Sequence, residues 1–146
     1  MSQFEFQIEG IKRVKAEMDL IDIKIEHMLQ SIMASSLLKI TELVNSGYNV
    51  FGDPFTPYSA SYLKWRRKTG RTTRPNMQNT SSMMNSLAVI RRSKAFYAIG
   101  GKGTDKHGES NVAKLKKLEN HKNYKILFWS DILKDIVDRY WEKLKL

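Results

Sequence analysis

The apolar residues in the first third of the chain recur at alternating steps of three and four. Ile11, Val14, Met18, Ile21, Ile25, Met28 and Ile32 therefore lie along one side of a helix. A second stripe, made of Met33, Leu37, Ile40 and Val44, is displaced by about one residue. The displacement indicates that the helix bends, or changes the surface that it meets, near residues 31–36. Gly47 is the expected C-terminal stop of this helix.

A helix over residues 11–46 is longer than a domain of this size is wide. At a rise of 1.5 Å per residue it spans about 50 Å, whereas 146 residues correspond to one compact domain. Part of the helix must then contact something else. We predict an oligomer interface on its first stripe, at Ile11, Val14, Met18, Ile21 and Ile25. The alternative is a broken helix that packs entirely on the chain's own sheet.

The remaining elements predict a single α+β domain over residues 1–146. Alternating Phe4, Phe6 and Ile8 suggest a strand over residues 3–9, and two further runs, 88–92 and 95–99, suggest a hairpin or a bent strand. Residues 124–129 also have a strand-like pattern. Helices are expected at 60–69 after Ser59, at 111–119 and from Asp131 to about residue 143. The long N-terminal helix and the C-terminal helix should pack on a small, mostly antiparallel sheet, with residues 47–81 as an extended loop.

The charge of the chain is concentrated in its middle. Residues 54–104 carry ten basic and no acidic residues, which equals the formal net charge of +10. Such a region attracts an anionic partner, either phosphate groups or the carboxylates of another protein. We predict that aromatic and basic side chains of the loop bind this partner, with Tyr62, Leu63 and Trp65 as anchors. The full set is Tyr58, Tyr62, Leu63, Trp65, Arg66, Arg67, Lys68, Arg71 and Arg74.

The sequence disfavours an enzyme, a cofactor site and a metal site. There is no cysteine, the three histidines have no metal-pair spacing, and the basic middle lacks carboxylates for acid–base chemistry. Gly100 to Thr104 lacks the spacing of a phosphate-binding P-loop. No apolar run approaches the length of a membrane span, and the first ten residues lack the basic start of a signal peptide. We therefore expect a protein made in a cytoplasm, with no membrane partner.

The order of several short motifs resembles the virion-morphogenesis, or tail-completion, family of tailed bacteriophages. The resemblance begins with a strand, glycine and helix at residues 6–11 and the segment Gly52 to Ser59, which a basic run follows. A turn over residues 77–87 has Ser81 where the family usually has glycine. Tyr97-Ala98-Ile99, then residues 118–121 and 126–131, match the later landmarks in order.

This resemblance implies a non-enzymatic virion subunit that is assembled in the bacterial host cytoplasm. Such a subunit would form a homo-oligomeric ring, expected to be a hexamer, at the head–tail junction or the head-proximal end of the tail. Its partners would be neighbouring neck, head-completion or tail-tube and terminator proteins, and genomic DNA could pass through its lumen. The alternative function is a basic nucleic-acid-binding module that acts through residues 58–74 and 91–102.

Overall fold

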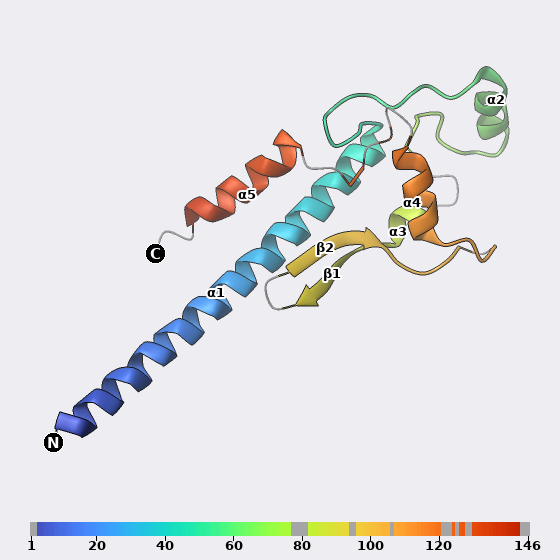
Figure 1. Ribbon diagram of the computed structural model, residues 1–146. Helices are drawn as coiled ribbons and strands as arrows, with labels where there is room; N and C mark the ends of the chain where they lie inside the picture. The colour runs from blue at the N-terminus through green and yellow to red at the C-terminus, as the bar shows by residue number, and fades with distance from the viewer. Residues whose placement is uncertain are drawn as a thin grey trace.

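A computed structural model describes residues 3–76, 82–93, 96–105, 107–120, 124, 126–127 and 130–143. In chain order the elements are α1 (Gln3–Ser46), α2 (Ala60–Lys68), α3 (Ser82–Asn85), β1 (Leu87–Ser93), β2 (Phe96–Gly101), α4 (Asn111–Glu119) and α5 (Asp131–Lys143). Figure 1 shows α5 running back along α1 and a two-stranded sheet on the other side of the long helix. The predicted α+β class is confirmed.

Helix α1 is one uninterrupted helix of 44 residues, about 66 Å long at the usual rise. Gly47 ends it with φ 89°, and the N–H groups of Gly47 and Tyr48 donate to the carbonyls of Val44 (3.0 Å) and Leu43 (2.9 Å). This double closure is a Schellman motif, whose left-handed residue favours glycine. The predicted C-terminal stop is therefore confirmed, and the broken helix is excluded.

The strand predicted over residues 3–9 is wrong, because this segment is the first part of α1. A strand needs a neighbouring strand to accept and donate its backbone hydrogen bonds, whereas a helix satisfies them within the segment. The hairpin strands pair with each other and lie far from the N-terminal end of α1 (Figure 1). Without a sheet edge to join, the alternating pattern does not decide the backbone conformation.

Strands β1 and β2 form the predicted antiparallel hairpin, with Leu87 opposite Gly101 and Arg91 opposite Tyr97. The outer part of the hairpin is joined to the middle of α1. Tyr97 Oη donates to Glu26 Oε1 (3.1 Å) and accepts from Gln30 Nε2 (3.1 Å), and Arg91 forms an ion pair with Glu26 (2.5 Å). Through these contacts the hairpin covers α1 from Glu26 onward.

The core lies between the C-terminal half of α1, α5 and the base of the hairpin. Ile40 and Val44 on α1 are almost completely buried, and Leu133 and Ile136 on α5 pack in the same cluster. Ser35 and Tyr140 add a hydroxyl–hydroxyl hydrogen bond of 2.8 Å between the two helices. The predicted α5 is confirmed, including the N-cap bond from the Leu133 N–H to Ser130 Oγ.

The strand expected over residues 124–129 is wrong for the three of these residues that the structure describes. Tyr124, Ile126 and Leu127 do not lie in a strand, and the other three residues lie outside the described part of the chain. Ile126 is completely buried in the core, and Tyr124 stacks on Phe55 with ring centroids 5.3 Å apart. The apolar run is therefore explained by core packing rather than by pairing in a sheet.

Candidate assembly surfaces

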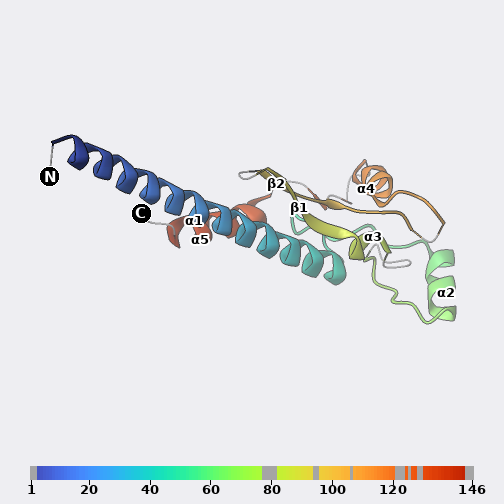
Figure 2. The same cartoon turned by 90° about the horizontal axis from the view of Figure 1, so that it is seen from below.

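Residues 10–24 of α1, which we call the helix extension, project beyond the rest of the fold (Figures 1 and 2). The hydrogen bonds and ion pairs that join α1 to other described elements begin at Glu26. The extension is about 22 Å long at the usual helical rise. Its side chains are consequently left without cover from the described part of the chain.

Four of the five predicted interface residues are exposed on this extension, and Ile25 is half-buried at its base. The exposed fractions are 69% for Ile11, 57% for Val14, 62% for Met18 and 37% for Ile21. Further along the same stripe, Met28 and Ile32 are buried against the fold. One apolar stripe therefore serves the core in its second half and is exposed to solvent in its first half.

A second exposed surface is the basic loop, residues 52–76, which carries α2. Asn49 holds the backbone turn that leads into the loop. Its side-chain Oδ1 accepts hydrogen bonds from the N–H groups of Phe51 and Asp53, both at 3.0 Å. The returning part of the loop contacts the outgoing part where Asn76 N–H donates to Tyr58 Oη (3.3 Å). Ser59 caps α2 through the N–H of Tyr62, as predicted. The loop is thus an ordered hairpin-like arm around a short helix.

Arg66 is the internal anchor of this loop, and its predicted role in facing a partner is wrong. The side chain is 1% exposed, and its guanidinium lies 4.9 Å from the Tyr58 ring centroid and 5.7 Å from that of Tyr62. Its Nε donates to the Thr72 carbonyl. A guanidinium can stack on aromatic faces and cross-link backbone at once, which a lysine ammonium cannot.

Trp65 lies on the surface of the loop instead of anchoring it, which corrects the second part of that prediction. It is 40% exposed, stacks on Tyr62 (5.3 Å between centroids) and is covered by the Arg71 guanidinium at 4.7 Å. Tyr62 and Leu63 are half-buried. Because helical side chains project in succession around the axis, the inward position falls to residue 66 and the neighbouring position 65 faces outward.

The other basic residues of the middle region divide by exposure. Arg91 is tied to Glu26, Arg71 covers Trp65, and Lys94 lies outside the described residues. The exposed remainder of the region is Lys64, Arg67, Lys68, Arg74, Arg92 and Lys102. Four of these six surround α2, so the charge that could meet an anionic partner gathers on the basic loop.

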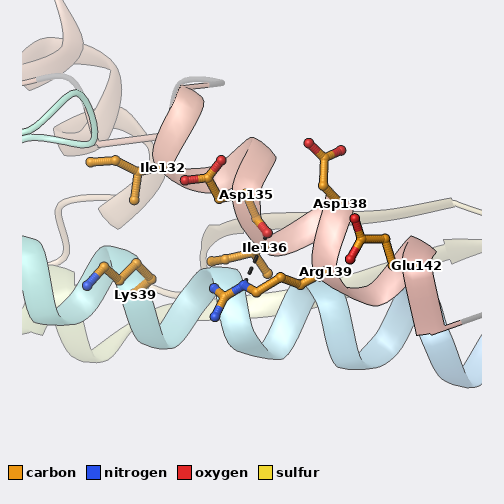
Figure 3. A pocket seen from close by; sticks show the side chains of 7 residues that line it. All are labelled: Lys39, Ile132, Asp135, Ile136, Asp138, Arg139 and Glu142. Carbon is orange, nitrogen blue, oxygen red and sulfur yellow. Dashed lines mark hydrogen bonds between the residues drawn. The ribbon is translucent and has the colours of Figure 1, made fainter.

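A third feature is a groove of about 540 Å³ between α1 and α5, which sequence reasoning missed (Figure 3). Ile132 and Ile136 form its apolar floor. Its polar lining consists of Lys39 from α1 and Asp135, Asp138, Arg139 and Glu142 from α5. Arg139 Nε donates to the Asp135 carbonyl (3.2 Å), and Asp138 pairs with Lys134. The spacing of Asp131, Asp135 and Asp138 predicts only a solvated helix face, because the sequence does not show that α1 lies alongside.

The loop between β2 and α4 contains the most strongly perturbed carboxyl group among the described residues. Asp105 accepts from the N–H groups of His107 (2.8 Å) and Glu109 (2.9 Å) and forms an ion pair with Lys114 on α4. The hydrogen bond from Lys114 is the main reason that the pKa of Asp105 falls from 3.8 to about 2. Lys117 likewise lowers the pKa of Glu109.

We expect this loop to lose stability only in strong acid. A carboxyl whose pKa is lower in the folded state stabilises that state above its unfolded pKa, and the contribution disappears as the pH falls toward the folded value. The stabilising effect of Asp105 is therefore lost as the pH falls from 3.8 to about 2. A titration of its carboxyl carbon by NMR should show a midpoint near the lower value. A midpoint near 4 would contradict the role of Lys114, and Lys114→Gln is the control that should raise the midpoint.

The described residues contain no group of three or more histidine or acidic side chains arranged to hold a metal ion. Within the same residues, no helix combines the length and apolar character needed to cross a membrane. The chain matches no family model, no curated protein and no solved structure. Its function must therefore be argued from the surfaces above and from the order of its motifs.

Proposed function

We propose that this protein is a structural virion subunit that forms a ring at the head–tail junction, or at the head-proximal end of the tail, of a bacteriophage. The observation that carries the proposal is the helix extension, whose exposed stripe of Ile11, Val14, Met18 and Ile21 has no cover within the described fold. Large contiguous apolar surface on a soluble domain indicates a protein interface. The motif order described above suggests which kind of assembly this is.

The basic loop suits contacts with a second, different partner. Its charged side chains Arg67, Lys68 and Arg74 are exposed, and Arg66 holds the loop together from inside. Exposed charges at an interface mainly increase the association rate and determine which partner binds. We infer that the loop contacts acidic surfaces of an adjacent ring protein, since tight phosphate contacts would hinder DNA that must move through a lumen.

The experiment replaces one exposed stripe residue in the phage genome and examines the particles by electron microscopy. Val14→Asp places a charge on the stripe at a position that is 57% exposed, so the monomer should fold normally. The expected result is separate heads and tails that fail to join. Lys24→Asp is a control with an added acidic group on the same helix but off the stripe, and it should give joined particles.

The basic loop also makes nucleic-acid binding the second candidate, because exposed cations lie beside the exposed ring of Trp65. Binding to duplex DNA would show log affinity falling linearly with log salt, with a slope of roughly 0.9 per neutralised phosphate. Joined particles from Val14→Asp, together with tight, salt-sensitive DNA binding that Arg67→Ala/Lys68→Ala abolishes, would replace the ring proposal with this one.

A further inference from the structure

We propose that the helix extension of one subunit lies in the groove between α1 and α5 of the next subunit. This inference rests on the proposed ring and names the surface on which the extension docks. A closed ring is built from heterologous contacts, in which one patch meets a different patch on the neighbour. The extension is the projecting patch (Figure 1), and the groove is a hollow on the same chain that can receive it (Figure 3).

The groove has the shape and chemistry that an amphipathic helix requires. Its floor is formed by the apolar side chains Ile132 and Ile136, and charged side chains line its rim. The extension presents the apolar stripe Ile11, Val14, Met18 and Ile21, with charged residues on the ridge beside it. A helix laid in a groove between two helices buries such a stripe and keeps the flanking charges at the rim.

The charge order along that ridge complements the groove in one direction. Lys12 and Lys15 come first, and Asp19 and Asp22 follow at helical steps of four and three. At one end of the groove lie Glu142 and Asp138, the second of which pairs with Lys134. Toward the other end lie the cations Arg139 and Lys39 together with Asp135, and Lys39 also forms an ion pair with Glu42 (3.4 Å) (Figure 3). The acidic charge therefore predominates at the Glu142 end.

The extension should therefore run antiparallel to α5. Its lysines would lie at the Glu142 end, and its aspartates would approach Arg139 and would compete with Glu42 for Lys39. No ion pair links Asp135 or Glu142 to another described residue. A neighbour's lysine can consequently pair with Glu142 without first displacing an internal partner from it.

The extension cannot reach the groove of its own chain. Ser35 touches Tyr140, so Glu142 lies beside residues just before Ser35 on α1. Lys15 is on the same straight helix about 25 Å further toward the N-terminus. The occupant of the groove must then come from a second copy. Pairing of two extensions with each other would close at two subunits and could not build a ring.

The test is a disulfide between neighbouring subunits in the full-length protein, which has no cysteine of its own. Cysteines form a bridge only when their Cα atoms are within about 7 Å, so an internal bridge between positions 15 and 142 is excluded. The double variant Lys15→Cys/Glu142→Cys should give, on oxidation, a ladder of dimers, trimers and larger species on a denaturing gel. Each single variant should stay monomeric on that gel.

A charge exchange gives a second readout that does not depend on oxidation. Lys15→Glu and Glu142→Lys should each weaken association by about threefold to tenfold in analytical ultracentrifugation, and the double variant Lys15→Glu/Glu142→Lys should recover it. Lys15→Glu/Glu109→Lys is the control without recovery, because it makes the same exchange of charges but puts the lysine on the loop before α4, outside the groove.

Three outcomes would overturn this docking mode. They are a Lys15→Cys single variant that forms disulfide dimers, a double cysteine variant that forms no ladder, and a protein that stays monomeric at the highest attainable concentration. Failed joining of Val14→Asp particles combined with any of these results would leave the proposed function standing and reject only the groove as the docking surface. Normal joining of those particles would reject the function itself.

Discussion

Replacing Ile40 by alanine should lower the free energy of unfolding by about 2–5 kcal/mol, the usual cost of truncating a buried isoleucine. Ile40 is 1% exposed and lies at the centre of the core cluster with Val44 and Leu133. The substitution removes three carbon atoms from a packed interior and leaves a cavity that the neighbouring side chains can only partly fill. Urea unfolding followed by far-ultraviolet circular dichroism measures the change.

The matched control is Ile11→Ala, the same substitution on the same helix. Ile11 is 69% exposed, and alanine has the better helix propensity, so the free energy of unfolding should change by no more than about 0.5 kcal/mol. Measurements at low protein concentration keep any association out of the comparison. Equal losses from Ile11→Ala and Ile40→Ala would show that the extension packs against its own fold, contrary to the structure.

Replacing Arg66 by alanine should open the basic loop without unfolding the domain. The substitution removes the group that lies over Tyr58 and Tyr62 and leaves the Thr72 carbonyl without its donor. Loss of a partly buried, charge-assisted hydrogen bond and the associated packing costs about 1–3 kcal/mol. Hydrogen exchange of the amides of α2 should accelerate accordingly, whereas amides of α1 near Val44 should keep their protection.

Arg67→Ala is the control for this experiment. Arg67 is next to Arg66 on α2, but its side chain is exposed to solvent. Its amide exchange should match that of the unaltered protein. Arg66→Lys should behave almost like Arg66→Ala, since an ammonium keeps the charge but lacks the planar group that stacks and donates in two directions. Unchanged exchange in Arg66→Ala would mean that the loop is held by its other contacts alone.

The elements of this fold could largely be predicted from local sequence. The step of three and four in α1, the glycine at position 47, and Ser59 and Ser130 before α2 and α5 are local signals. The structure confirms the end of α1 and the bounds of α2 and α5 within a few residues, whereas α1 begins at Gln3 rather than near residue 11. Such signals are reliable because they reflect backbone hydrogen bonding and side-chain spacing over one or two turns. The hairpin follows from the same kind of evidence.

Only the tertiary structure decided what each apolar or charged residue contacts. The stripe of α1 is uniform in sequence, yet Ile32 is buried and Val14 is exposed, because the contacts that the described hairpin residues make with α1 begin at Glu26. Arg66 and Arg67 are adjacent and chemically identical, yet one holds the loop together and the other faces solvent. Residues 3–9 alternate like a strand but form helix, and the described strands β1 and β2 pair with each other rather than with this segment. For the stripe of α1 the deciding factor is a hairpin distant in sequence, and for Arg66 it is the path by which the loop folds back on α2. A local pattern contains no information about either.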